Sequence, residues 1–148
     1  MFSLSSCNSE NSNHATLLTF DISPDGNNLV FALAEEGKSS IYKLELKNRN
    51  IEKLFDAEDS ISFYSPRFNT DGDSIVFISS NFPKKLNSTI WVANLSNNEK
   101  QVVLDDPTIK TEVIFLKMEE SFIIYRQKIM LDIRLWEEKQ HINLILWN

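Results

Sequence analysis

The sequence predicts an all-β protein, and three observations lead to that expectation. Apolar runs of roughly four to eight residues follow one another from Leu17 onward, which is the length of strands rather than of helices. Asp-Gly, Asn-Asn and serine-rich breaks separate these runs, as turns separate strands. The same order of runs and breaks also returns after a fixed interval, so the chain contains a structural repeat.

The composition favours one ordinary folded domain. The chain has 148 residues, of which 42% are hydrophobic and 24% charged, so a core can form without metals or cross-links. The net charge of −6 would repel a phosphate backbone, and nucleic acid is not an expected partner. One cysteine and two histidines are too few for a zinc site, and we expect neither a metal nor another cofactor. No apolar run is long enough for a membrane-spanning helix.

The repeat is clearest around two Asp-Gly turns. Residues 22–31 (Ile-Ser-Pro-Asp-Gly-Asn-Asn-Leu-Val-Phe) align without a gap with residues 68–77 (Phe-Asn-Thr-Asp-Gly-Asp-Ser-Ile-Val-Phe). Glycine supplies the positive φ that a tight hairpin needs, which gives Asp25-Gly26 and Asp71-Gly72 a structural role in their turns. A third and weaker copy spans residues 116–125 and has Glu120 where the others have glycine.

Each of the first two units is expected to contain four antiparallel strands. The predicted strands are residues 17–22, 29–33, 40–46 and 51–55, and then 62–68, 74–79, 89–95 and 101–104. The second strand of a unit is apolar on both faces, so we expect each sheet to be covered by neighbouring sheets. Asn48 to Asn50 and Asn97-Asn98 are expected to close the last hairpin of each unit. Four antiparallel strands in such a unit describe one blade of a β-propeller.

The motifs of residues 20–31 and 65–77 resemble the WD40-like (PD40) repeat of TolB-type β-propellers. As in that family, each motif is followed by a strand with an isoleucine and an aromatic residue, Ile41-Tyr42 and Ile90-Trp91. Similar blades occur in a periplasmic protein of the Tol-Pal system, in prolyl-oligopeptidase-like peptidases and in other bacterial envelope proteins. The resemblance implies a protein partner bound through loops or the central channel.

From this resemblance we expect a non-enzymatic scaffold of the periplasm or bacterial cell envelope that mediates protein-protein interaction. One alternative is the propeller portion of a peptidase or other hydrolase whose catalytic domain lies elsewhere. Another is a module that binds a glycan or a small ligand, for which exposed aromatic side chains would be needed. The fold by itself does not choose among these three hypotheses.

The length allows about two to three blades, so the expected architecture is a partial β-propeller. The repeats cover residues 17–126, with blades near 17–56, 62–105 and 113–147. The tail, residues 127–148, lacks the pattern and is either the end of the third blade or the product of a truncation; it holds two further candidate strands, 129–136 and 142–147. Because a closed propeller needs at least about four blades, either subunits self-associate to complete a ring or the chain is part of a longer protein.

Residues 1–16 are rich in serine and asparagine, and we expect a flexible leader. Within it, Leu4-Ser-Ser-Cys7 resembles the lipobox of bacterial lipoproteins, which makes Cys7 a candidate lipid attachment site and membrane tether. The signal peptide that such a motif needs would have to begin upstream of Met1. The alternative is that Cys7 is a free thiol.

No catalytic, cofactor-binding or metal-binding residue is expected. Asp25 and Asp71 could be paired carboxylates, but their place beside glycine favours turns. No G-x-S-x-G motif accompanies His14 and His141, and the glycines are too isolated for a phosphate-binding loop. Four aromatic residues are expected to pack between blades rather than to stack on a ligand: Phe31, Tyr42, Phe77 and Trp91.

Overall fold

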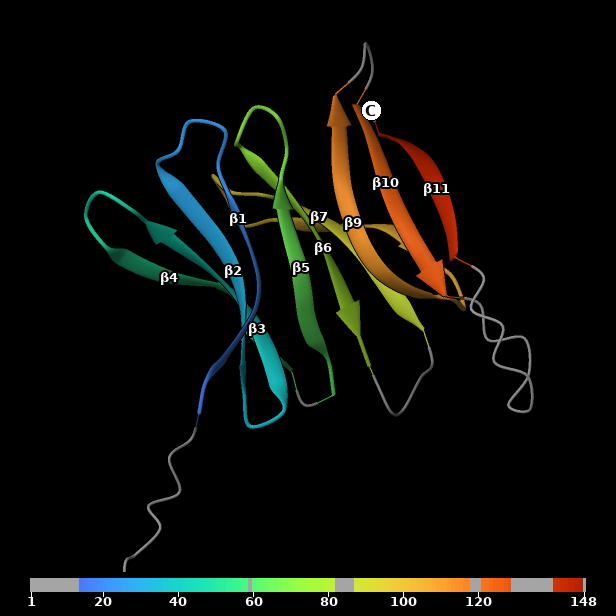
Figure 1. Ribbon diagram of the computed structural model, residues 1–148, viewed down its shortest axis with the longest axis horizontal. Helices are drawn as coiled ribbons and strands as arrows, with labels where there is room; N and C mark the ends of the chain where they lie inside the picture. The colour runs from blue at the N-terminus through green and yellow to red at the C-terminus, as the bar shows by residue number, and fades with distance from the viewer. Residues whose placement is uncertain (1–13, 59, 82–86, 118–120, 129–139, 148) are drawn as a thin grey trace, which may run out of the picture.

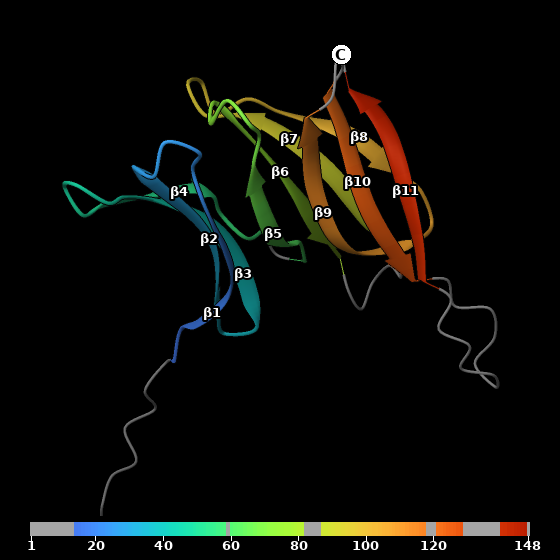
Figure 2. The ribbon, with the colours of Figure 1, turned by 45° about the horizontal axis from the view of Figure 1, so that its top comes forward.

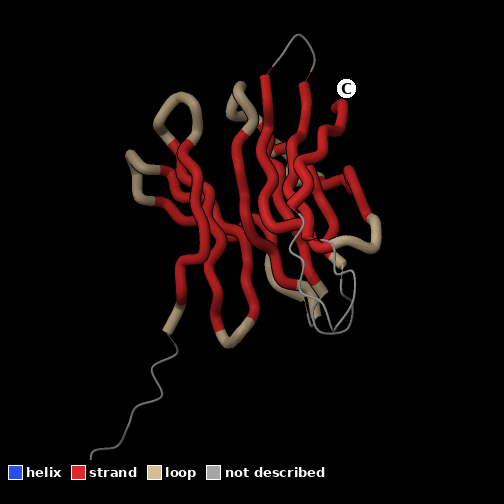
Figure 3. Tube along the Cα trace, turned by 45° about the vertical axis from the view of Figure 1, so that its right-hand side comes forward, coloured by secondary structure: helices blue, strands red, loops and turns tan. Residues whose placement is uncertain are grey.

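The computed structural model describes residues 14–58, 60–81, 87–117, 121–128 and 140–147, and within them the chain forms three antiparallel sheets (Figure 1). The sheets follow one another across the molecule in chain order, and the described residues contain strands and turns but no helix (Figure 3). The predicted all-β partial propeller is confirmed.

The first two sheets each have four strands in sequential order. The first contains β1 (Thr16–Ile22), β2 (Asn28–Glu35), β3 (Lys38–Glu45) and β4 (Asn50–Phe55). The second contains β5 (Ser62–Phe68), β6 (Ser74–Ser80), β7 (Ser88–Asn94) and β8 (Lys100–Asp105). All eight predicted strands are present, with ends within two residues of the prediction.

The third sheet has the order β11-β10-β9. Its strands are β9 (Ile109–Lys117), β10 (Ser121–Lys128) and β11 (Gln140–Trp147). β9 starts ahead of the predicted residue 113, and the predicted strand at 142–147 is part of β11. The predicted strand at 129–136, the leader up to residue 13 and Glu120 lie outside the described residues.

The repeat extends to the hydrogen bonds of the first hairpin in each unit. Gly26 has φ 73° and its N–H donates to the Ser23 carbonyl at 2.8 Å, while Gly72 has φ 77° and donates to the Asn69 carbonyl at 3.2 Å. The last hairpins also contain a left-handed residue, which is Arg49 in one and Asn98 in the other. Turns therefore lie at the two Asp-Gly pairs and at the asparagine-rich breaks.

Strand irregularities also recur at equivalent positions. The register shifts after Leu17 in β1 and after Tyr64 in β5, where Ser65 has φ 55°. It shifts again after Ile41 in β3 and after Ile90 in β7. Bulges of this kind bend a strand and increase its twist, so matching bulges give neighbouring sheets matching shapes that can stack.

β6 is the centre of the molecule because its two faces contact different sheets. Ile75 and Phe77 belong to the cluster shared with the first sheet, and Val76 and Ile78 belong to the cluster shared with the third. All four side chains are fully buried. The alternation follows from the two-residue period of a strand, and it confirms that an inner strand apolar on both faces lies between two other sheets.

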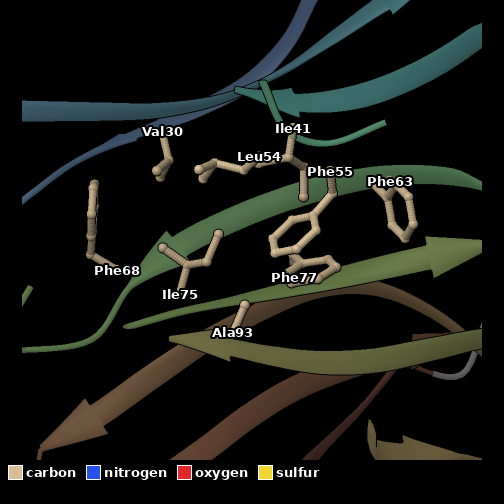
Figure 4. Packing of buried hydrophobic residues seen from close by; sticks show 9 residues of the cluster. All are labelled: Val30, Ile41, Leu54, Phe55, Phe63, Phe68, Ile75, Phe77 and Ala93. Carbon is tan, nitrogen blue, oxygen red and sulfur yellow. The ribbon is translucent and has the colours of Figure 1, made fainter. Parts of the chain in front are cut away.

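Aromatic side chains fill the junction between the first and second sheets (Figure 4). Phe77 stacks on Phe55 with ring centroids 5.0 Å apart, and Phe63 meets Phe77 edge-on at 5.7 Å. Trp91 packs against this cluster, and its Nε1 donates a hydrogen bond to Ser79 Oγ at 2.8 Å. The predicted packing between blades is thus confirmed for Phe77 and Trp91.

Polar contacts join β1 to β5 beside this apolar cluster. The Ser65 N–H donates to Thr19 Oγ1 at 3.2 Å, and the Phe68 N–H donates to Asp21 Oδ2 at 2.9 Å. Arg67 Nη1 donates to the Phe20 carbonyl at 3.1 Å. The first strands of the two sheets are therefore connected by side chains, because no backbone ladder joins them.

The junction between the second and third sheets contains a fully buried lysine, Lys110, where the first junction has Phe63. The backbone carbonyl of Phe63 accepts a hydrogen bond from the Ser39 hydroxyl, and the backbone carbonyl of Lys110 accepts one from the hydroxyl of the equivalent Ser88. Lys110 Nζ donates to the Ser88 carbonyl at 2.6 Å and to Asp106 Oδ1 at 2.5 Å. A buried ammonium needs such partners, and these connect the start of β9 to β7 and to the β8–β9 linker.

Partial burial raises the pKa of Asp106, but hydrogen bonds from Lys110 and Thr108 outweigh this effect and hold that pKa below its ordinary value. The carboxylate therefore stays ionised opposite the ammonium. β9 starts earlier than predicted because these hydrogen bonds order Lys110 and its neighbours.

We expect Lys110→Met to lower the free energy of unfolding by about 3 kcal/mol, because it leaves Asp106 and the Ser88 carbonyl without their donor. Urea unfolding of the full chain measures this. Lys53→Met is the matched control, because the exposed pair of Lys53 and Asp56 should contribute nothing measurable. Equal losses of unfolding free energy in Lys110→Met and Lys53→Met would contradict a stabilising role of the buried lysine.

We expect Gly72→Ala to destabilise more than Gly26→Ala. Both residues have a positive φ, which costs a residue with a side chain about 1–2 kcal/mol. A Cβ on Gly72 would also lie 3.3 Å from Pro24 Cδ, whereas nothing lies within 4 Å at Gly26. Urea unfolding should show a larger loss of unfolding free energy for Gly72→Ala than for Gly26→Ala. Pro24→Ala in the Gly72→Ala background should remove this difference. No difference between the two alanine variants would refute the contact.

Candidate protein-binding face

The first sheet has one covered face and one open face. Val30 and Ile41 point toward the second sheet and are fully buried there. The side chains on the other side form what we call the open face: Phe20, Ile22, Leu29, Phe31, Tyr42, Leu44 and Ile51. Figure 2 shows the first sheet, blue to teal, at one end of the array, and among the described residues the second sheet is the one packed on it.

The strand register arranges the open face in two rows. Ile22 is opposite Leu29, Leu29 opposite Leu44, and Leu44 opposite Ile51. In the next row Phe20 is opposite Phe31, and Phe31 is opposite Tyr42. Residues directly opposite each other share a face of the sheet, so each row crosses it from one strand to the next.

These rows expose large apolar side chains. Phe20 is 52% exposed, Ile22 51% and Ile51 60%. Phe31 is almost buried because the Tyr42 ring stacks on it, with centroids 5.4 Å apart and planes 15° apart. Contiguous apolar patches of this kind are typical of binding surfaces, which makes the open face a candidate site.

The equivalent residues of the second sheet are buried. Phe68 matches Ile22 in the repeat and is 7% exposed, and Ile75 and Phe77 match Leu29 and Phe31 and are fully buried. The first sheet covers these side chains, and the open face has no such cover among the described residues. The open face therefore has the composition of a junction surface. This corrects the prediction for Phe31 and Tyr42, which lie here rather than between two blades of this chain.

A charged pair lies at the margin of the open face. Lys53 Nζ lies 5.4 Å from the centroid of the Tyr42 ring and 2.9 Å from Asp56 Oδ1. The hydrogen bond to Asp56 raises the pKa of Lys53, and the same bond lowers the pKa of Asp56. An apolar centre with a charged rim is the usual anatomy of a protein interface.

Asp25 is engaged within its own turn. Its Oδ1 accepts from Ser23 Oγ at 2.6 Å and from the Asn27 N–H at 3.0 Å, and its Oδ2 accepts from Asn27 Nδ2 at 2.7 Å. These bonds, led by the one from Ser23, lower the pKa of Asp25 to about 2. A carboxylate with that pKa is a poor general acid or base near neutral pH. The turn of Asp71 and Gly72 adjoins this one, since Pro24 lies against Gly72.

The side chains of two further sequence candidates are not described by the structure. Cys7 lies outside the described residues, so its lipid attachment stays a prediction, and for His141 only the backbone of β11 is described. Among described residues no group of three or more His, Cys, Asp or Glu could hold a metal, and no helix could span a membrane.

Two hollows on the described surface are polar. One of about 460 Å³ is lined by Ser74, Val92, Asn94, Glu99, Lys100 and Gln101. Another of about 410 Å³ is lined by Glu35, Glu36, Lys38, Ser40, Asp56 and Ala57. Neither lining contains a histidine or cysteine, which are the common partners in nucleophilic catalysis.

Comparison with solved structures defines the class of this fold. A chain from Agrobacterium tumefaciens named as TolB has a TM-score of 0.67 and 14% identity, with 93% of this chain and 47% of that chain covered. A chain from Clostridium novyi NT named as a conserved lipoprotein has a TM-score of 0.70 and 15% identity, with 93% of this chain and 91% of that chain covered. The tricorn protease has a TM-score of 0.63 and 14% identity, with 88% of this chain and 18% of that chain covered.

The chain therefore has the fold of a TolB-like β-propeller-repeat protein with an incomplete ring of blades. It spans less than half the length of the TolB chain from Agrobacterium tumefaciens. No protein-family model matches the sequence, and no curated protein matches it.

Sequence reasoning missed the open face, although a signal for it was present. The first unit carries apolar residues at the positions where the second unit packs on a preceding sheet, as in the match of Ile22 with Phe68. The alignment of the two copies therefore indicated a second apolar face on the first sheet, but not whether another sheet covers that face.

We expect the Asp25 carboxyl to titrate with a midpoint near pH 2 in ¹³C NMR of the folded protein. The folded pKa is below the ordinary 3.8, so this group stabilises the fold above about pH 4, and that stabilisation is lost as the pH falls toward 2. Ser23→Ala should move the midpoint upward, because it removes the largest cause of the shift. A wild-type midpoint near 3.8 would contradict the hydrogen-bonded turn.

Proposed function

We propose that this protein is a non-enzymatic scaffold of the bacterial cell envelope that binds a protein partner. The observation that carries the proposal is the open face, where Phe20, Ile22 and Ile51 are each more than half exposed in one continuous patch. Burying such side chains stabilises a complex by roughly 25 cal/mol per Å² of apolar surface. Their equivalents in the second sheet already make this kind of contact.

The envelope location is supported by the named neighbours and by the leader. TolB and a conserved lipoprotein share the fold, and Leu4 to Cys7 resembles a lipobox. On this proposal Cys7 carries a lipid that holds the leader at a membrane, and the blades extend from it. The acidic charge of the chain agrees with a protein partner rather than a nucleic acid.

The second candidate is the propeller portion of a peptidase, and the likeness to the tricorn protease favours it. In that case the open face would dock on another part of the same enzyme and the catalytic residues would lie there. The non-enzymatic scaffold remains the first proposal because it accounts for the open face, and because neither of the two polar hollows has a histidine or cysteine in its lining.

Photo-crosslinking tests the proposal. A benzoylphenylalanine placed at Ile51, on the open face, should crosslink a protein of a bacterial envelope extract. The same group placed at Val102, which is 50% exposed on β8 of the middle sheet, should not. Adducts are identified by mass spectrometry, and an adduct of two copies of this chain does not count as an envelope partner. The same adducts at both positions, or no envelope protein at Ile51, would refute the proposal.

A further inference from the structure

Three aromatic rings surround the ammonium of Lys100 at the junction between the first and second sheets. Its Nζ lies 4.8 Å from the ring centroid of Phe63, 5.1 Å from that of Trp91 and 5.4 Å from that of Phe55. We call these three rings the aromatic cage. They come from β4, β5 and β7, so the cage forms only where the two sheets pack together. A cation within about 6 Å of a ring face is attracted by the quadrupole of the ring.

The strand register directs Lys100 toward the aromatic cage. Lys100 of β8 is opposite Ala93, which lies two residues from Trp91 on β7, so the three side chains share one face of the second sheet. Ala93 is buried in the cluster shared with the first sheet, which makes this the face of the junction. The equivalent of Lys100 in the first sheet is Ile51. The repeat itself therefore does not require a cation at this position.

Lys100 lacks the kind of partner that other lysines of this protein have. Lys43, Lys53 and Lys110 each pair with a carboxylate. In the part of the chain that the structure describes, the Lys100 ammonium has the three rings and no hydrogen bond or ion pair. Lys100 is also an exposed residue. Cation–π contacts of exposed lysines are weak, so this ammonium can leave the aromatic cage.

The rings are held by other contacts and stay in place when the ammonium leaves. Phe55 stacks on Phe77 with centroids 5.0 Å apart, and Phe55 and Phe63 lie 6.3 Å apart with their planes tilted by 57° (Figure 4). Trp91 is fixed by the hydrogen bond from its Nε1 to Ser79 Oγ. A preformed site loses little conformational freedom when a ligand binds.

The aromatic cage lies toward the outer edge of the junction, where a ligand can reach it. β5 is the strand of the second sheet that packs on β1, β2 and β3, whereas β4 and β8 are not packed on each other in this way. Val102, which follows Lys100 on the same face of β8, is 50% exposed. Movement of the lysine head therefore uncovers the rings without separating the sheets.

We propose that the aromatic cage binds a trimethylammonium group in place of the Lys100 ammonium. A methyl carbon touches a ring at about 3.5–4.0 Å and the C–N bond is roughly 1.45 Å, which places a methylated nitrogen about 5 Å from the ring. The distances at Lys100 match that spacing. A trimethylammonium group has no N–H to withdraw from water, whereas a lysine ammonium has three, and aromatic cages are known to recognise such quaternary cations.

This inference goes beyond the proposed function, because it concerns another surface than the open face and another class of ligand. The occupied cage leaves the open face free for a protein partner. The lysine acts as a competitor that is tethered beside its own site, and a ligand has to displace it.

Titration of the full chain with choline chloride, followed by NMR of the choline methyl protons, tests the proposal. Wild type should bind choline with a Kd of about 1–10 mM, and the ¹⁵N NMR signal of the Trp91 indole N–H should shift on binding. Neohexyl alcohol has the same shape with carbon in place of the charged nitrogen, and it should bind at least about 10-fold more weakly. Sodium chloride at equal concentration controls for ionic strength.

Two lysine variants form a matched pair. Lys100→Ala removes the tethered competitor and should tighten choline binding on the order of 10-fold. Lys53→Ala removes an ammonium that lies over the single ring of Tyr42 and should leave choline affinity unchanged. Trp91→Phe in the Lys100→Ala background retains an apolar ring but weakens the attraction for a cation, so choline binding should fall. Circular dichroism checks that each variant is folded.

Two results would overturn the proposal. Choline bound by Lys100→Ala but not by wild type would make Lys100 a permanent occupant of the aromatic cage. Equal affinities for choline and neohexyl alcohol would mean that the site recognises apolar shape and not a cation.

Vesicles distinguish the two sources of a trimethylammonium group. Sedimentation of the protein with phosphatidylcholine vesicles but not with phosphatidylglycerol vesicles, weakened by Trp91→Phe, would identify a lipid headgroup as the ligand. Choline binding without vesicle binding would identify a free solute. Failure to bind either one overturns the inference and leaves the crosslinking test of the open face unaffected.

Discussion

The need to cover both faces of each apolar sheet governs this structure. β6 meets it fully, because Ile75 and Phe77 are buried against the first sheet while Val76 and Ile78 are buried against the third. An isolated sheet with such a strand would leave both of its apolar faces in water, so its folding is favoured by packing against neighbouring sheets. Stacking covers both faces of the middle sheet, whereas the open face of the first sheet has no cover among the described residues.

The polar groups of the junctions fit this arrangement. Where Phe63 fills the first junction with an aromatic ring, Lys110 fills the second with an ammonium that must be given acceptors. The ring requires only apolar neighbours, while the ammonium fixes a particular path for the β8–β9 linker. The two junctions therefore share a backbone plan but are held by different interactions, which explains how a repeat can drift in sequence and keep its geometry.

Much of the fold could be predicted from local signals. The Asp-Gly turns at Gly26 and Gly72 define the first hairpins because a positive φ is easy for glycine, and the alternation around Tyr42 separates the two faces of its strand. The candidate site could not be predicted in the same way. Phe31 and Phe77 hold matching positions in the repeat and each follows a valine, yet Phe77 stacks on Phe55 of another sheet and Phe31 stacks on Tyr42 of its own sheet.

The sequence by itself determined the strands, their turns and the period of the repeat, because these depend on side-chain alternation and on backbone preferences within a few residues. Only the tertiary structure decided which apolar faces are covered. Ile22 and Phe68 hold matching places in the repeat, but the first sheet covers Phe68, whereas among the described residues no sheet covers Ile22. Burial is a property of contacts between distant segments, and the end of a stack has a different environment from its middle even where the sequence repeats.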